Sequence, residues 1–425
     1  MMKRKEPEKG RLEQIPRDLK KKKKMSVTHH QKEQVKSPRG GGKKLVVPFD
    51  LEEEIMSRLP GKSLMRFLCV SKTWSSLIRS QRFVASYYAK KPSRFIVAFS
   101  NSVFGDPKRL FILTGEEEET SCSSSEDSLV ANLDMTIPGV TIAHGPFQYS
   151  SVHGYLVCFQ LSKFIICNPS TGQVIRFHAK TQLTSLGYDP VDDQFKALTQ
   201  VSCLLHSNLS SMTSMVHEVI RLGRRRGGGG GGVVSRRQFT SPPYYPLTLG
   251  RSINGFMYYA AWAPSQEEGE TPVFVCFDVR NEKILSFISA PKEVLASEAY
   301  TRLIEYKGKL AVIAGNYGSS FDLWTLEDVT KHEWSKQTFE LPLSEALISQ
   351  GTNKAGEIVF SPSSLPGPAQ PFYVFHFNPD TKSTRRVRIH GVADTQEFWT
   401  RYGLSATDPC CAVFSPQHAD TIAFL

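Results

Sequence analysis

The sequence lacks the features that mark extracellular, membrane or metal-binding proteins. Its eight cysteines include no CxxC pair, and none pairs with a histidine at a zinc-binding spacing. No apolar run approaches the ~20 residues of a membrane span, and the charged N-terminus has no apolar stretch typical of a secretion signal. We therefore expect an intracellular chain with no metal site and no membrane contact, whose cysteines are buried free thiols.

Motifs of catalysis and nucleotide binding are also missing. Gly61-Lys62-Ser63 resembles the end of a phosphate-binding loop, but Met56 stands where its first glycine belongs. The glycine run 227–232 lies between arginines, which is typical of a flexible basic loop. There is no GxSxG or HExxH motif, and the scattered histidines belong to no recognisable catalytic motif. We expect a protein that is not an enzyme and needs no cofactor.

The net charge of +11 comes from one end of the chain. Residues 1–44 hold 16 of the 52 basic and 5 of the 41 acidic residues, which leaves 36 of each elsewhere. Because this segment has few apolar side chains, we expect it to be disordered. Its lysine run indicates a nuclear localisation signal or, equally, a solubilising tail, so the expected location is the nucleus, the cytoplasm or both. The run consists of Lys20, Lys21, Lys22, Lys23 and Lys24.

A short amphipathic helix is predicted after the basic segment. Leu51, Ile55 and Leu59 recur at i, i+4 and i+8, which places them on one apolar stripe. Asp50 is the expected N-cap, with Glu53 three residues on as in a capping box. The helix is expected to end at the proline and glycine of residues 60–61.

Three more short helices are predicted up to residue 88. Their expected N-caps are Ser63, Ser71 and Ser80, each followed by apolar side chains at helical spacing. Four short helices in about 45 residues cannot bury a large core. We therefore expect a partner to cover their apolar face.

From residue 94 onward the pattern is that of β-strands. Residues 94–99 and 109–113 predict a hairpin. A unit then recurs that consists of a glycine turn, an apolar strand, an Asp or Asn turn and a returning strand. Its copies cover residues 153–177, 254–288, 307–339 and 355–389, with a degenerate copy at 186–198.

The spacing of these copies predicts the architecture. The turn glycines Gly154, Gly255, Gly308 and Gly356 are separated by 101, 53 and 48 residues. A period near 50 with several strands per repeat is typical of a β-propeller, and the length available allows about six blades. Strand counting alone leaves a β-sandwich open. The predicted fold class is α+β, with a disordered tail at 1–44, an all-helical motif at 45–90 and a large all-β, propeller-like domain at 91–425.

Two stretches of the chain resemble known families. Residues 47–83 resemble a plant-type F-box in their Val-Pro and Leu-Pro pairs, in the run from Lys62 to Phe67 and in residues 69–74; Val47 replaces the usual Leu. The downstream part resembles the plant F-box-associated domain at residues 168–172, 187–196 and 323–336. Together the two resemblances cover roughly residues 45–420.

The resemblance implies a substrate-recognition subunit of an SCF-type ubiquitin ligase. The F-box would bind a Skp-family adaptor, and through it a cullin, whereas the β domain would bind an unknown protein target. The adaptor-binding residues expected from this resemblance are Pro48, Leu51, Ile55, Leu59, Pro60, Leu64, Val70 and Trp74. The alternative for some of them, Trp74 especially, is that they pack inside the helices.

Target binding is expected on loops of the β domain, since loops vary without disturbing a core. Candidate loops cover residues 263–270, 316–320 and 361–370, and Trp262 at the edge of the first is the candidate anchor. Its alternative role is that of a core tryptophan at a strand end.

Two other functions remain open from the sequence. A nucleic-acid-binding or scaffold protein could act through the basic tail, although the neutral body shows no such motif. A propeller enzyme would need acidic or histidine residues gathered at its centre, which a sequence cannot display.

Overall fold

The computed structural model describes most of the chain after the basic segment. The described residues are 48–101, 108–117, 127–142, 149–160, 162–181, 183–201, 213–224, 231–265, 269–295, 301–315, 320–341, 347–405, 410–422 and 425. The expected disordered tail, with its lysine run, lies outside them. No helix in these ranges is long and apolar enough to span a bilayer.

Four short helices come first, as predicted. They are α1 (Phe49–Arg58), α2 (Gly61–Phe67), α3 (Lys72–Ile78) and α4 (Gln81–Lys90). Two further helical elements lie within the β region: the 3-10 turn η3 (Lys292–Leu295) and helix α5 (Gln396–Tyr402).

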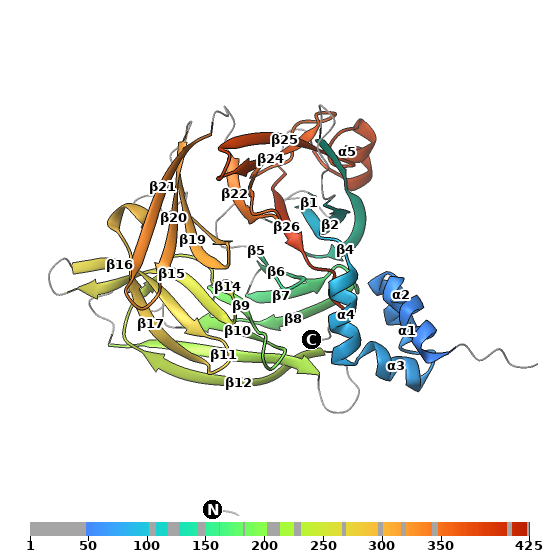
Figure 1. The fold of residues 1–425 in the computed structure, drawn as a ribbon, viewed down its shortest axis with the longest axis horizontal. Helices are drawn as coiled ribbons and strands as arrows, with labels where there is room; N and C mark the ends of the chain where they lie inside the picture. The colour runs from blue at the N-terminus through green and yellow to red at the C-terminus, as the bar shows by residue number, and fades with distance from the viewer. Residues whose placement is uncertain are drawn as a thin grey trace, which may run out of the picture. The chain divides into compact units, whose positions relative to one another are not determined.

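The described strands then form six sheets, which we number as blades 1 to 6 in chain order (Figure 1). Blade 1 contains β26 (Ala412–His418), β1 (Arg94–Ser100), β2 (Arg109–Glu116) and β4 (Asn132–Pro138). Blade 2 contains β5 (Tyr149–Val152), β6 (Tyr155–Gln160), β7 (Lys163–Asn168) and β8 (Gln173–His178). Blade 3 contains β9 (Thr184–Asp189), β10 (Gln194–Gln200), β11 (Met215–Arg224) and β12 (Gly231–Ser241).

The remaining three blades follow the same plan. Blade 4 contains β13 (Tyr245–Pro246), β14 (Arg251–Ile253), β15 (Phe256–Ser265), β16 (Gly269–Asp278) and β17 (Lys283–Ser289). Blade 5 contains β18 (Arg302–Tyr306), β19 (Lys309–Gly315), β20 (Ser320–Asp328) and β21 (Glu333–Glu340). Blade 6 contains β22 (Leu347–Thr352), β23 (Ile358–Pro362), β24 (Phe372–Asn378) and β25 (Ser383–His390), with β3 (Asp127–Val130) beside β25.

The predicted glycine turns join the first two strands of three blades. His153 and Gly154 have φ values of 49° and 84°, and the corresponding pairs in blades 4 and 5 are likewise positive at both positions. Two adjacent positive φ values define the type I′ turn, whose twist matches that of a β-hairpin and which favours glycine. The repeat found in the sequence is therefore the hairpin that opens a blade.

Each pair of neighbouring blades encloses its own core, because both faces of the strands are apolar. In β1, Phe95, Val97 and Phe99 pack against blade 6, while Ile96 and Ala98 face blade 2. Similar clusters fill the other four blade-to-blade spaces. This closed ring of cores confirms the predicted propeller of about six blades and excludes the two-sheet sandwich.

Two strand pairings join parts of the chain that are far apart. The C-terminal strand β26 pairs antiparallel with β1, so blade 1 is built from both ends of the domain (Figure 1). Strand β3 leaves blade 1 and pairs in parallel with β25 of blade 6. Both pairings tie blade 1 to the end of the chain, and β26 closes the ring.

Candidate functional site

Helix α1 begins without the side-chain cap that the sequence predicted. Its N-cap is Pro48, which is extended and makes no capping side-chain hydrogen bond, so the expected capping box of Asp50 and Glu53 is wrong. Asp50 and Glu52 instead occupy the first turn, where a negative charge is favourable. The helix ends at Arg58, whose guanidinium donates to Glu54 one turn earlier at 2.9 Å.

Two of the three other predicted caps are confirmed. The Ser71 hydroxyl accepts a hydrogen bond from the backbone N–H of Trp74 at 3.0 Å, and Ser80 accepts one from Phe83 at 3.2 Å. Ser63 is not a cap, because α2 already begins at Gly61 after Pro60. The capped turns hold α3 and α4 at fixed start points and so set which faces turn inward.

The inner faces of the four helices share one small core. Leu64 and Phe83 are completely buried, so Leu64 belongs to this core and not to an exposed docking face as expected. Leu59 and Trp74 are partly exposed and pack against the same core. The buried members contributed by the helices are Met56, Leu64, Leu77, Ile78, Phe83 and Tyr87.

Hydrogen bonds fix the edges of this core. The Tyr87 hydroxyl donates to the carbonyl oxygen of Leu59 at 3.0 Å, which ties α4 to the end of α1. The indole Nε1 of Trp74 donates to the Glu52 carboxylate at 2.9 Å, and its ring stacks edge-on against Phe67. Trp74 therefore holds α1 and α3 together.

The outer face of the helices exposes large apolar side chains. Leu51 and Ile55 on α1 are each 55% exposed, and Val70 between α2 and α3 is 60% exposed. Pro48 and Pro60 are also exposed. Such side chains gain free energy when a partner covers them, about 1.5–3 kcal/mol for each one fully buried. This is the surface that the sequence assigned to the adaptor.

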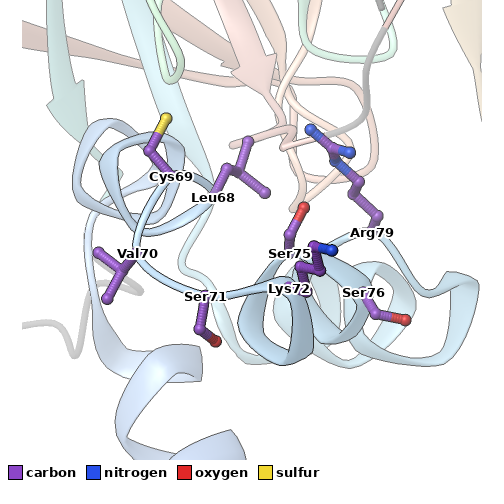
Figure 2. A pocket seen from close by; sticks show the side chains of 8 residues that line it. All are labelled: Leu68, Cys69, Val70, Ser71, Lys72, Ser75, Ser76 and Arg79. Atoms are coloured by element: carbon purple, nitrogen blue, oxygen red, sulfur yellow. The ribbon is translucent and has the colours of Figure 1, made fainter. Parts of the chain in front are cut away.

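An open depression of about 490 Å³ lies next to Val70. Figure 2 shows Leu68, Cys69 and Val70 on the turn that leaves α2, with polar side chains of α3 facing the same space. The remaining lining residues are Ser71, Lys72, Ser75, Ser76 and Arg79. A partner helix that covers Val70 would meet a mixed apolar and polar surface here.

The helices also contact the C-terminal segment of the chain. Ile422 is completely buried among the core residues of the helices. Its neighbour Thr421 accepts a hydrogen bond at its carbonyl oxygen from Asn168 of blade 2 at 2.9 Å. A Cβ at Gly61 would lie 2.6 Å from the carbonyl oxygen of Ser170, so only glycine allows this close approach of α2 to blade 2.

Charged side chains surround this junction. Arg94 donates to the Asp420 carboxylate at 2.9 Å, and Lys62 of α2 pairs with Asp134 of β4. Burial would raise the pKa of Asp420, but the guanidinium of Arg94 and the hydroxyl of Ser170 lower it overall. Burial lowers the pKa of the adjacent His418 to about 4, so this histidine is neutral at physiological pH.

Other ionic clusters join strands within a blade or between neighbouring blades. Glu282, in the turn between β16 and β17, pairs with Lys196 at 3.1 Å and with Arg221 at 2.5 Å, both on blade 3. In blade 6, Glu357 accepts from Arg385 at 2.8 Å. Burial would raise the pKa of Glu357, but its hydrogen bonds to His376, Arg385 and Asn353 hold it well below its usual range. These carboxylates are saturated with partners, which fits a structural role better than a catalytic one.

Most cysteines in the described part of the chain lie in the cores between blades. No group of three or more His, Cys, Asp or Glu side chains there could hold a metal ion. Five of the six described cysteines are buried, and Cys69 is exposed. Burial raises the pKa of the Cys158 thiol to about 12, so it stays protonated and unreactive.

Trp262 lies within strand β15, where it pairs with Tyr245 and Pro272. Its ring is partly buried and packs against the cores on both sides of blade 4. Most of the loop expected at 263–270 is strand, since β15 continues to Ser265 and β16 starts at Gly269. This placement favours the core role for Trp262, and its role in target binding stays a prediction.

The sequence missed the contribution of the C-terminus to the helical core. Ile422 comes more than 300 residues after α4, and no local pattern links the two. The one signal was indirect: four helices too small to bury a core need apolar contacts with another segment or protein. Part of those contacts comes from the C-terminal segment of the same chain.

Comparisons with known proteins agree with this architecture. An F-box domain model matches residues 45–86, and a model described as the F-box associated beta propeller domain matches residues 94–418. Among solved structures, a Synechocystis apocarotenoid oxygenase covers 70% of this chain and 78% of its own at a TM-score of 0.36 and 9% identity. That likeness is too low to bear on function.

Plant proteins match over most of their length. The F-box protein At1g30790 of Arabidopsis thaliana is 43% identical over 402 residues, which cover 89% of this chain and 98% of that protein. The F-box protein DOR, also of Arabidopsis thaliana, is 34% identical and covers 81% of this chain and 88% of its own. The chain therefore belongs to the F-box proteins whose F-box is followed by an F-box associated β-propeller domain.

Proposed function

We propose that this chain is the substrate-recognition subunit of an SCF-type ubiquitin ligase. In this role the F-box binds a Skp-family adaptor, and through it a cullin, while the propeller holds a protein target. The observation that carries the proposal is the exposed apolar face formed by Leu51, Ile55 and Val70. Three large apolar side chains exposed on one small helical motif are typical of a surface that a partner covers.

The propeller supports a holding role. Two of its buried carboxylates, Glu282 and Glu357, are engaged in ion pairs between or within blades, which fits a structural role. A receptor contributes by raising the concentration of the target near the transfer enzyme. In this role the chain needs two binding surfaces and no active site.

The adaptor contact is tested with substitutions that leave the core untouched. Leu51→Gln combined with Ile55→Gln removes apolar surface from the outer face of α1 and keeps good helix formers. We expect adaptor binding to weaken by at least about tenfold, because two apolar contacts are lost. The matched control is Leu285→Gln on β17, which is 47% exposed and lies far from α1 in the chain.

Purification of the intact chain separates the two surfaces. The Leu51/Ile55 variant should lose the adaptor and the cullin but retain the target proteins that the wild type recovers. Thermal unfolding of both variants should match the wild type, which shows that the fold is intact. Unchanged recovery of the adaptor by a folded Leu51/Ile55 variant would contradict the proposed adaptor contact.

A further inference from the structure

The centre of the propeller contains an arginine that reaches across it. Arg251 begins β14, the short inner strand of blade 4. Its Nη2 atom lies 3.5 Å from the position that a Cβ would take at Gly351, on the inner strand β22 of blade 6. Pro416 of β26, in blade 1, is 3.9 Å from that same position. Blades 4, 6 and 1 are not all neighbours, so the guanidinium lies where inner strands face one another.

This guanidinium has no carboxylate bound to it. Among the residues that the structure describes, no hydrogen bond or ion pair joins the side chain of Arg251 to another group. Two other cations within the blades, Arg94 and Lys196, do have such a partner: Arg94 lies 2.9 Å from Asp420, and Lys196 lies 3.1 Å from Glu282.

A cation that is partly removed from water and has no ionic partner can gain free energy from an anion that binds it. The side chain of Arg251 is largely, but not completely, buried. Burial accordingly lowers the pKa of Arg251, while the negative charge of Glu305 on β18 acts in the opposite direction. Glu305 forms no ion pair with Arg251 in the described residues, so it offsets only part of the imbalance.

The backbone beside the guanidinium belongs to a glycine. Gly351 has a φ of +118° at a bulge in β22, a conformation that other residues rarely adopt. A Cβ there would already touch the guanidinium, and any longer side chain would occupy the space next to it. In the same strand, the hydroxyl of Ser349 is buried without a hydrogen-bond partner in the described chain.

We propose that the centre of the propeller binds a small oxyanion through Arg251. The planar guanidinium fork matches a carboxylate or a phosphate group, to which it donates two parallel hydrogen bonds. The bound anion neutralises the charge at the centre and links inner strands that belong to separate blades. Its function is independent of the adaptor contact, which lies on the helices at residues 51–70.

The test uses the full chain and two probes, inorganic phosphate and acetate, each titrated at constant ionic strength made up with potassium chloride. The melting temperature of the wild type should rise in a saturable way with at least one probe, because a ligand that binds only the folded state stabilises it. Arg251→Gln, which removes the charge, should raise the half-saturating concentration by about tenfold or more. Arg251→Lys, which keeps the charge but loses the fork, should give an intermediate value.

Arg237→Gln is the matched control, since Arg237 is an exposed arginine of β12 that pairs with Glu282. It should respond to the probes as the wild type does. Equilibrium dialysis of labelled phosphate and labelled acetate against the wild type needs no variant and covers the case in which Arg251→Gln does not fold. Absence of saturable binding of both probes to the wild type overturns the proposal, and so does an equal response of folded Arg251→Gln.

Discussion

Ile422 offers the sharpest test of how the helices are stabilised. The side chain is completely buried among residues of α1 to α4, and its Cγ2 lies 3.4 Å from the Cβ position of Gly61. Ile422→Ala removes three carbon atoms from this core and leaves a cavity. Substitutions of this kind destabilise by about 2–5 kcal/mol, and Ile422→Val by about 0.5–1.5 kcal/mol.

The assay must show where the loss of stability occurs. Urea unfolding gives the free energy for the two variants and for Leu285→Ala, an exposed control expected to stay within about 0.5 kcal/mol of the wild type. Hydrogen exchange then locates the effect: amides of α2 and α4 should lose protection, whereas strands of blade 4 should keep it. The graded response from valine to alanine identifies the cause as lost packing.

The result that would refute this reasoning is specific. If Ile422→Ala changes the free energy no more than Leu285→Ala does, then Ile422 does not belong to the helical core. If blade 4 loses protection as much as α2 and α4, the residue supports the propeller and not the helices. Either outcome would show that the C-terminal segment does not stabilise the F-box helices.

Further predictions follow from single contacts. Ser80→Ala should cost about 1 kcal/mol in urea unfolding because the α4 cap is lost, whereas Asp50→Ala removes only a favourable charge in the first turn of α1 and should cost less. Burial lowers the pKa of His217 to about 4, so the unfolded state binds more protons than the folded state between pH 4 and 6.5. This histidine should therefore lower the free energy of unfolding by about 2 kcal/mol when the pH falls from 7 to 5. His217→Gln should remove that part of the pH dependence. Trp262→Ala should lower the melting temperature clearly, by a loss of about 3 kcal/mol, if the ring belongs to the core. Replacing Lys20–Lys24 by Gln should move a fluorescent fusion from nucleus to cytoplasm if the run is an import signal, and no redistribution would leave only the solubilising role.

Local signals in the sequence predicted local structure well. Ser71 and Ser80 cap their helices because a short hydroxyl side chain can reach the backbone two or three residues on. The same signal failed at Ser63, where Pro60 and Gly61 start the helix earlier than the serine would. Turn glycines such as Gly154 were found because a type I′ turn demands a positive φ, which leaves a mark in the sequence.

Contacts between distant segments have no comparable local pattern in the sequence. The pairing of β26 with β1 and the parallel contact of β3 with β25 depend on how the ring closes, not on the residues of one strand. The resemblance to an F-box placed Leu64 on the adaptor-binding face, yet it is buried because the other helices and the C-terminal segment fold over it. For the same reason, the ion pair of Arg94 with Asp420 could not be anticipated.

The position of blade 1 couples the closing of the propeller to the F-box. Strand β1 begins four residues after α4 ends, and β26 leads directly into Asp420 and Ile422. The helices are therefore joined to the ring from both ends of the domain, so they are held more rigidly than a single linker would hold them. This rigidity would suit the proposed receptor role, because a fixed span between adaptor and target raises the effective concentration at one distance. Opening blade 1 would withdraw Ile422 from the helical core, and we therefore expect the apolar face of Leu51 and Ile55 to be fully ordered only when the ring is closed.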